Sequence, residues 1–95
     1  MHFAGTTQDG VADGRIDLTF RLWSRPQVKV GGRYETAGVT IEVDDMELVP
    51  FSTVTEDDAR RSGHPDREAL RAITAHAGAV TDDTLVYRIE FHVVR

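Results

Sequence analysis

The chain has no cysteine among its 95 residues. It therefore cannot form a disulfide, use a thiol nucleophile or hold a metal ion through thiolate ligands. No apolar run approaches the roughly 18 residues that a membrane helix needs. The first residues, MHFAGTTQDGVADG, lack the basic start and the apolar stretch of a signal peptide. We therefore expect a cytoplasmic protein with no membrane partner, and the short length allows a single domain.

Aromatic side chains and positive charge are also scarce. Aromatic residues make up 7% of the chain, and 11 basic residues stand against 16 acidic ones, for a net charge of −5. Residues 15–33 nevertheless hold five basic side chains against one acid, together with the only tryptophan. This asymmetry favours one focused surface that attracts anions. An equally simple interpretation is a hairpin whose charges are merely solvated.

The most regular pattern near the start of the chain is an alternation of apolar and polar residues over residues 15–23. Such a period of two is typical of a half-buried strand. If the apolar set faces the core, then Thr19, Arg21 and Trp23 line up together on the opposite face. Residues 1–14 show no such period and are rich in Gly, Thr, Asp and Gln, so we expect a flexible N-terminal arm before a domain over residues 15–95.

Three further strands are predicted. KVGGRY reads as a tight turn in which both glycines are free to take positive φ, and it leads into a short strand over residues 33–36. Alternation over residues 39–49 slips by one position at Asp44-Asp45, which predicts one long strand with a bulge. The last apolar alternation, over residues 85–93, predicts a strand in the centre of a sheet.

Two short helices are predicted before that last strand. Thr55 with Asp58 three positions on forms a capping-box start, and Gly63 suits the end of the same helix. Asp66 caps a second helix. Strands at both ends with helices between them indicate an α+β fold, built as a small, strongly bent sheet or an open barrel.

Four segments of the chain follow one another in the order and spacing of a known family. They are TFRLW, KVGGRY, TIEVDDMELVPFSTVTEDDARRSG and VYRIEFHVV. Over residues 16–94 the chain resembles the ASCH domain. The resemblance implies a PUA-like bent β-barrel with two short helices inserted before the last strand. It also implies a cleft near the T-x-R strand that binds RNA or modified nucleosides, with no cofactor.

One bacterial branch of that family hydrolyses N4-acetylcytidine with a lysine, a threonine and a glutamate. Thr19 and Arg21 occupy the T-x-R positions here, but the lysine position falls on Ile16 and the glutamate position on Ser62. A threonine hydroxyl needs an adjacent base before it can act as a nucleophile. The resemblance therefore favours binding over hydrolysis and leaves Thr19 as the single catalytic candidate.

Six side chains form the predicted ligand or RNA site. Arg21 would bind a phosphate or a base edge, Trp23 would stack on a base, and Thr19 would hydrogen-bond a polar atom. Positive charges that flank the turn would position the phosphate backbone, and they belong to Arg25, Lys29 and Arg33. The alternative for this face is structural, with Trp23 capping the core and Arg21 paired with Glu42 or Glu90.

Two other functions stay open. An enzyme with altered groups, such as an amidohydrolase or a ribonuclease-like protein, would use Thr19 with His92. A protein-interaction module would have no nucleic-acid ligand, and the oligomeric state is not fixed by the sequence. No metal is expected, because the four histidines have no ligand spacing and the acids at residues 44–47 resemble a solvated face.

Overall fold

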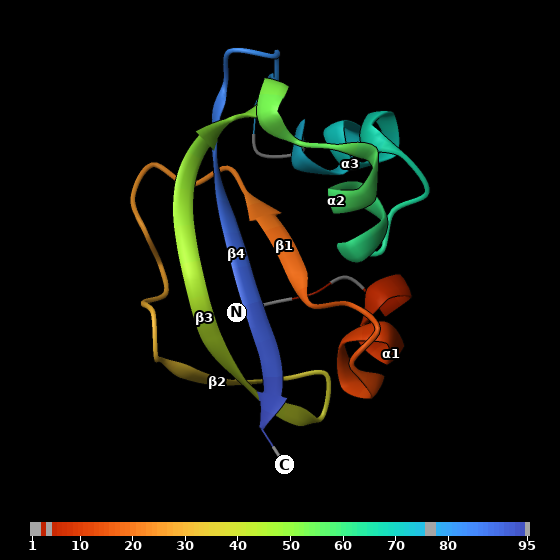
Figure 1. The fold of residues 1–95 in the computed structure, drawn as a ribbon, viewed down its shortest axis with the longest axis vertical. Helices are drawn as coiled ribbons and strands as arrows, with labels where there is room; N and C mark the ends of the chain where they lie inside the picture. The colour runs from red at the N-terminus through yellow and green to blue at the C-terminus, as the bar shows by residue number, and fades with distance from the viewer. Residues whose placement is uncertain (1–2, 4, 76–77, 95) are drawn as a thin grey trace.

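The fold is a four-stranded antiparallel sheet with helices packed beside it (Figure 1). The computed structural model describes residue 3, residues 5–75 and residues 78–94. The strands are β1 (Leu18–Arg21), β2 (Arg33–Thr36), β3 (Val39–Pro50) and β4 (Leu85–Val94). The helices are α1 (Gly5–Asp13), α2 (Glu56–Arg61) and α3 (Arg67–Thr74), and a 3₁₀ turn covers Phe51–Thr53. The α+β class and the two short helices before the last strand are confirmed.

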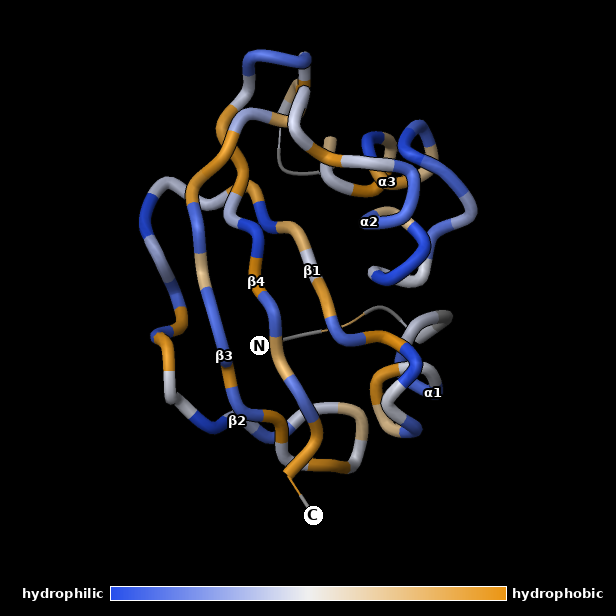
Figure 2. Tube along the Cα trace, in the orientation of Figure 1, coloured by the Kyte–Doolittle hydropathy of each residue, from blue (hydrophilic) through white to orange (hydrophobic). Residues whose placement is uncertain are grey.

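The last strand lies in the middle of the sheet, in the order β1-β4-β3-β2. β4 is antiparallel to β1 on one side and to the long strand β3 on the other. The register between β3 and β4 shifts between Val43 and Asp45, where the slipped alternation had predicted a bulge. Hydrophobic and hydrophilic residues alternate along β3 and β4, so each strand presents two different faces (Figure 2).

The two faces of the sheet can be defined from the register. Partners in an antiparallel pair point to the same side. The helix face is the side that α2 and α3 cover, and it carries Leu18, Phe20, Val86, Arg88 and Glu90. The loop face is the opposite side, and it carries Thr19, Arg21, Met46, Tyr87 and Ile89.

Apolar packing covers both faces. On the helix face, side chains from β1 and β4 pack against the 3₁₀ turn and the helices, in a cluster of Leu18, Phe20, Phe51, Val54, Ala59, Leu70, Val80 and Val86. On the loop face, Val28 from the β1–β2 connection packs on Val43 and Ile89. The sheet is therefore buried in the middle, and exposed surface on the loop face is confined to its margins.

The β1–β2 connection is fastened to the sheet by backbone hydrogen bonds. The Gly31 amide donates to the Val43 carbonyl at 2.7 Å, and the Val43 amide donates to the Gly32 carbonyl at 3.0 Å. Gly31 has a φ of 80°, as the turn predicted, but positive φ at Gly32 was a wrong expectation. Gly32 is needed for close approach instead, because a Cβ there would lie 2.5 Å from the Tyr34 hydroxyl.

The helix α2 begins and ends as its sequence predicts. The Asp58 amide donates to Thr55 Oγ1 at 3.0 Å, and the Thr55 amide donates to Asp58 Oδ2 at 3.2 Å, which completes the capping box. Gly63 follows the helix with a φ of 92°. Asp66 caps α3 through the Ala69 amide. None of the helices in the described ranges is long and apolar enough to cross a membrane.

The N-terminal segment differs from the prediction, because residues 5–13 form the helix α1 rather than an unstructured arm. Tertiary packing stabilises this helix. Val11 is completely buried, and a Cβ on Gly10 would lie 2.5 Å from Ile16 Cδ1, so the helix backbone touches the chain that leads into β1. The ring of Phe3 lies 5.5 Å from that of Phe91. Such long-range contacts override weak local helix propensity.

Candidate nucleic-acid interface

Three of the six predicted site residues lie on the loop face, at and just beyond the end of β1. Thr19 pairs with Ile89 and Arg21 pairs with Tyr87, so both side chains point to the side that the loop covers. Trp23 packs against the apolar cluster of the loop face, which Val28, Val43 and Ile89 form. Thr19 is 8% exposed, whereas Arg21 and Trp23 are half-buried. The structure thus brings these three residues together on one face, although it covers that face more than the sequence suggested.

Arg21 is held in place by its neighbours. Its Nε donates to Thr19 Oγ1 at 3.2 Å, and its guanidinium lies 5.0 Å from the centre of the Phe3 ring. Burial lowers the pKa of Arg21, but a guanidinium remains protonated in any protein environment. A charged, oriented group that is partly removed from water attracts an anion more strongly than a fully solvated one.

Trp23 packs partly on the core, as the structural interpretation predicted, and keeps part of its ring exposed, as base stacking requires. One part of its surface packs on the core around Val28, and its ring lies 5.9 Å from that of Tyr87 at 43°. Both rings are half-buried. Leu48 pairs with Tyr87 in the register and is exposed, so an apolar margin continues beside the two rings. The aromatic pair Trp23 and Tyr87 therefore leaves partly exposed ring surface on the loop face.

The positive charges around the turn do not act as one group. Arg25 and Lys29 lie in the β1–β2 connection, are exposed, and form no ion pair within the described part of the chain. Arg33 is paired with Glu42, with 2.9 Å between Nε and Oε1. Arg33 pairs with Glu42, and Glu42 pairs with His92, so these three side chains point to the same side of the sheet. Arg21 pairs with Tyr87, which lies an odd number of positions from His92 along β4, so Arg21 points to the opposite side. Two unpaired cations therefore accompany the loop face, rather than three.

The acids that were considered as partners of Arg21 lie elsewhere. Glu42 contacts Arg33, and Glu90 contacts Arg88 on the helix face. That face holds a connected set of ion pairs: Arg88 reaches Asp58 at 3.3 Å, and Arg61 lies 3.9 Å from Glu90. These charges join α2 to the sheet.

The positions that matter for hydrolysis are closed. Ile16 is buried, and a Cβ on Gly63 would lie 2.6 Å from its Cδ1, so the two segments are in contact. Ser62 is buried, and its hydroxyl donates to the Ala59 carbonyl at 2.8 Å. Thr19 pairs with Ile89, and His92 lies three positions further along β4. Because successive side chains of a strand alternate between its faces, Thr19 and His92 point to opposite sides of the sheet. A Thr19–His92 pair is therefore excluded as a catalytic unit.

Comparison with known proteins identifies the fold. No family model and no curated protein matches the sequence. Among solved structures, the ASCH domain of Lactobacillus crispatus JV V101 superimposes with a TM-score of 0.71 at 19% identity, covering 90% of this chain and 69% of that one. A protein of Enterococcus faecalis V583 from the family DUF984 gives 0.68 at 18% identity, covering 92% and 66%. The chain has the ASCH-type fold.

Within this ASCH-type fold, two aromatic residues that complete the loop face, Phe3 and Tyr87, were not among the predicted site residues. Phe3 comes from the N-terminal segment and Tyr87 from β4, far from Trp23 along the chain. Tyr87 had a usable signal, because it belongs with Ile89 to the alternating apolar set of a strand that is predicted to be central. Phe3 had none, since its segment was predicted to be unstructured.

Proposed function

We propose that this ASCH-type domain binds single-stranded RNA, or a nucleotide-like ligand derived from it, at the margin of the loop face around Trp23. The main support for this proposal is that the half-buried Trp23–Tyr87 pair lies on the same face as the oriented guanidinium of Arg21. Aromatic surface beside fixed positive charge is the usual basis of single-strand recognition. The resemblance to ASCH domains in the sequence supports the same ligand class.

The steps of binding follow from the exposure of each group. Arg25 and Lys29, which are exposed and unpaired, supply the long-range attraction for phosphates. A base then stacks on Trp23, a contact worth about 1–3 kcal/mol. Arg21 forms a charge-assisted hydrogen bond to a phosphate or a base edge, and Thr19 orients its guanidinium. No bond of the ligand is broken in this scheme.

Binding without hydrolysis agrees with the closed packing at residues 16 and 62. The buried, apolar side chain of Ile16 stands where the resemblance places a lysine, and the buried Ser62 stands where it places a glutamate. Thr19 has an arginine as its hydrogen-bond partner, and an arginine cannot serve as a base.

The test is fluorescence-anisotropy binding of labelled single-stranded RNA over a salt series. Three cations, Arg21, Arg25 and Lys29, predict a slope of log affinity against log salt of about −2, because each neutralised phosphate contributes about −0.7. Trp23→Ala should lower the affinity about 5- to 150-fold, which is the loss of one stacked base. Arg25→Gln combined with Lys29→Gln should reduce the slope to about −0.7.

Arg33→Gln is the matched control, since it removes one positive charge from the same segment but from the opposite side of the sheet. It should leave both the affinity and the slope nearly unchanged. Equal losses in Arg33→Gln and in Arg25→Gln would show that only the net charge matters. No binding by the wild type at low salt would refute the proposal.

A further inference from the structure

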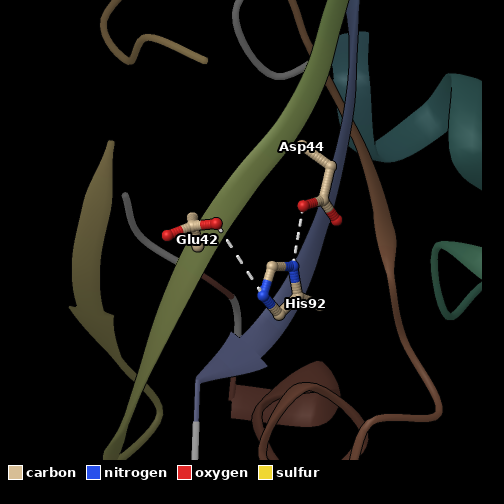
Figure 3. Close-up of side chains that lie close together, drawn as sticks. All are labelled: Glu42, Asp44 and His92. Carbon is tan, nitrogen blue, oxygen red and sulfur yellow. Dashed lines mark hydrogen bonds and ion pairs between the residues drawn. The ribbon is translucent and has the colours of Figure 1, made fainter. Parts of the chain in front are cut away.

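A second group of polar side chains lies on the opposite side of the sheet from Arg21. Glu42 and Asp44 on β3 and His92 on β4 point toward one another (Figure 3). His92 Nδ1 lies 2.7 Å from Asp44 Oδ1, and His92 Nε2 lies 3.9 Å from Glu42 Oε2. One ligand atom of each residue lies within 4.8 Å of one atom of each of the other two.

Strand geometry fixes all three residues. Glu42 and His92 are direct partners in the β3–β4 register, so their side chains leave the sheet next to each other. Asp44 is the extra residue of the bulge between Val43 and Asp45. Arg33 binds Glu42 Oε1 at 2.9 Å, and the other carboxylate oxygen is the one that faces the imidazole. The group is therefore oriented before any ligand arrives.

The imidazole has one lone pair that the protein does not satisfy when the ring is neutral. If Nδ1–H donates to Asp44, then Nε2 presents its lone pair to a carboxylate oxygen 3.9 Å away. A cation between these two acceptors would be bound by both of them, through the imidazole lone pair and the carboxylate oxygen. A histidine whose other nitrogen donates to a carboxylate is also the usual arrangement of a metal-bound imidazole.

We propose that His92 Nε2 and Glu42, with Asp44 holding the imidazole through Nδ1, form a surface site for a divalent transition-metal ion of the Zn²⁺ class. Zinc binds imidazole and carboxylate atoms at about 2.0–2.2 Å, so two tetrahedral ligand atoms stand roughly 3.4 Å apart. The separation of Nε2 from Oε2 is 3.9 Å, about 0.5 Å longer than this value. Imidazole nitrogen favours Zn²⁺ over Mg²⁺ and Ca²⁺, which prefer oxygen ligands.

The surroundings leave room for the rest of the coordination shell. A hollow of about 340 Å³ adjoins the cluster and is lined by Asp44 and His92, together with Gly14, Ile16, Asp17, Phe91 and Val93. Water can occupy the remaining positions on the ion, because the His92 side chain is exposed and that of Glu42 is half-buried.

The experiment is a competition titration of the untagged chain with Zn²⁺ and a chromophoric chelator. The wild type should compete with the chelator, and His92→Ala and Asp44→Asn should each weaken binding by about 10- to 100-fold. His64→Ala is the control, because this half-buried histidine follows α2 and is not part of the cluster. It should leave the affinity unchanged.

A second readout locates the ion. In ¹H–¹⁵N spectra, Zn²⁺ should shift the amide signals around residues 42–44 and 92 and the ring nitrogens of His92, whereas Mg²⁺ at the same concentration should not. An unchanged Zn²⁺ affinity in His92→Ala would overturn the proposal. Equal shifts with Mg²⁺ and Zn²⁺ would overturn it as well, because they would indicate diffuse attraction to surface carboxylates.

Discussion

On the helix face, carboxylates hold the arginines of the sheet and of α2, whereas on the loop face a hydroxyl and an aromatic ring hold Arg21. Arg88 contacts Asp58 and Glu90, and Arg61 contacts Asp17 at 3.1 Å. Arg21 contacts Thr19 Oγ1 and the ring of Phe3. The positive charges of the helix face are neutralised within the protein, while Arg21 is oriented by the Thr19 hydroxyl and the Phe3 ring.

This difference separates arginines that stabilise the fold from those that can serve a ligand. A cation that already has a carboxylate partner must lose it to bind a phosphate, which offsets most of the gain. A cation held by neutral groups retains its attraction for anions. The apolar residues follow the same division: the cluster around Leu18 and Phe20 on the helix face is buried, whereas the loop face ends in the half-buried Trp23 and Tyr87.

The largest contrast between the faces should appear in matched leucine substitutions. Leu18 on the helix face is 0% exposed, and Leu48 at the margin of the loop face is 49% exposed. Leu18→Ala should lower the free energy of unfolding by about 2–5 kcal/mol, since it leaves a cavity. Leu48→Ala should change it by less than about 0.5 kcal/mol. Urea unfolding measures both, and similar losses would mean that the loop-face margin is as closely packed as the core.

Gly63→Ala should be the next most damaging change. Its φ of 92° disfavours a side chain, and the added Cβ would lie 2.6 Å from Ile16 Cδ1. Strain and overpacking together predict a loss of about 2–4 kcal/mol in thermal unfolding. Ile16→Val in the same chain should restore part of the loss, because it removes the clashing methyl group. An absence of any rescue would assign the whole effect to the backbone.

Asp58→Asn tests the ion pairs of the helix face. Burial raises the pKa of Asp58, but hydrogen bonds from the Thr55 amide and from Arg88 outweigh it, so the net pKa is below the ordinary 3.8. A depressed carboxyl pKa contributes stability above the unfolded value, and this stability is lost as the pH falls through the folded value. The variant should lose about 1–3 kcal/mol at pH 7.

The difference in unfolding free energy between wild type and Asp58→Asn should shrink below about pH 4, where both chains carry a neutral group at this position. Asp57→Asn is the control, since that carboxylate is exposed and its contact with Arg60 is 4.0 Å long. A pH-independent difference for Asp58→Asn would contradict the ionic contribution.

The smallest expected effect lies on the loop face. Tyr87→Leu keeps apolar bulk but removes the ring that lies 5.9 Å from Trp23. The aromatic pair contributes about 0.5–1.5 kcal/mol beyond its buried area. The variant should lose about this much stability, and the emission of the single tryptophan should shift to the red as water reaches the indole. An unchanged spectrum would mean that Tyr87 does not shield Trp23.

The sequence was most informative where local rules decide the structure. The bulge at Asp44 follows from a slip in alternation, and the start of α2 follows from Thr55 and Asp58. The central position of β4 follows from apolar residues on both of its faces. Each of these features depends on residues that are near neighbours along the chain.

Features that depend on distant contacts could not be predicted in this way. The helix α1 contains two glycines and is stabilised by the burial of Val11. The pairing of Glu42 with His92 requires the register of strands that lie far apart in the chain. The side on which Arg33 lies depends on the β2–β3 register, which the short Thr36–Val39 turn sets. That turn alone would have paired Arg33 with Glu42, but the side of the sheet relative to Arg21 also needs the long-range β3–β4 and β1–β4 registers.

The place of β4 between β1 and β3 also determines how the chain must fold. Leu18 pairs with Glu90, so the β1–β4 ladder closes a loop that spans most of the chain. Contacts of such high sequence separation slow folding, because the entropy of loop closure is lost before the contacts form. Until residues 85–94 arrive, β1 lacks its only described partner and β3 exposes one edge. Unfolded or newly made chains should therefore be most prone to aggregate through these two edges.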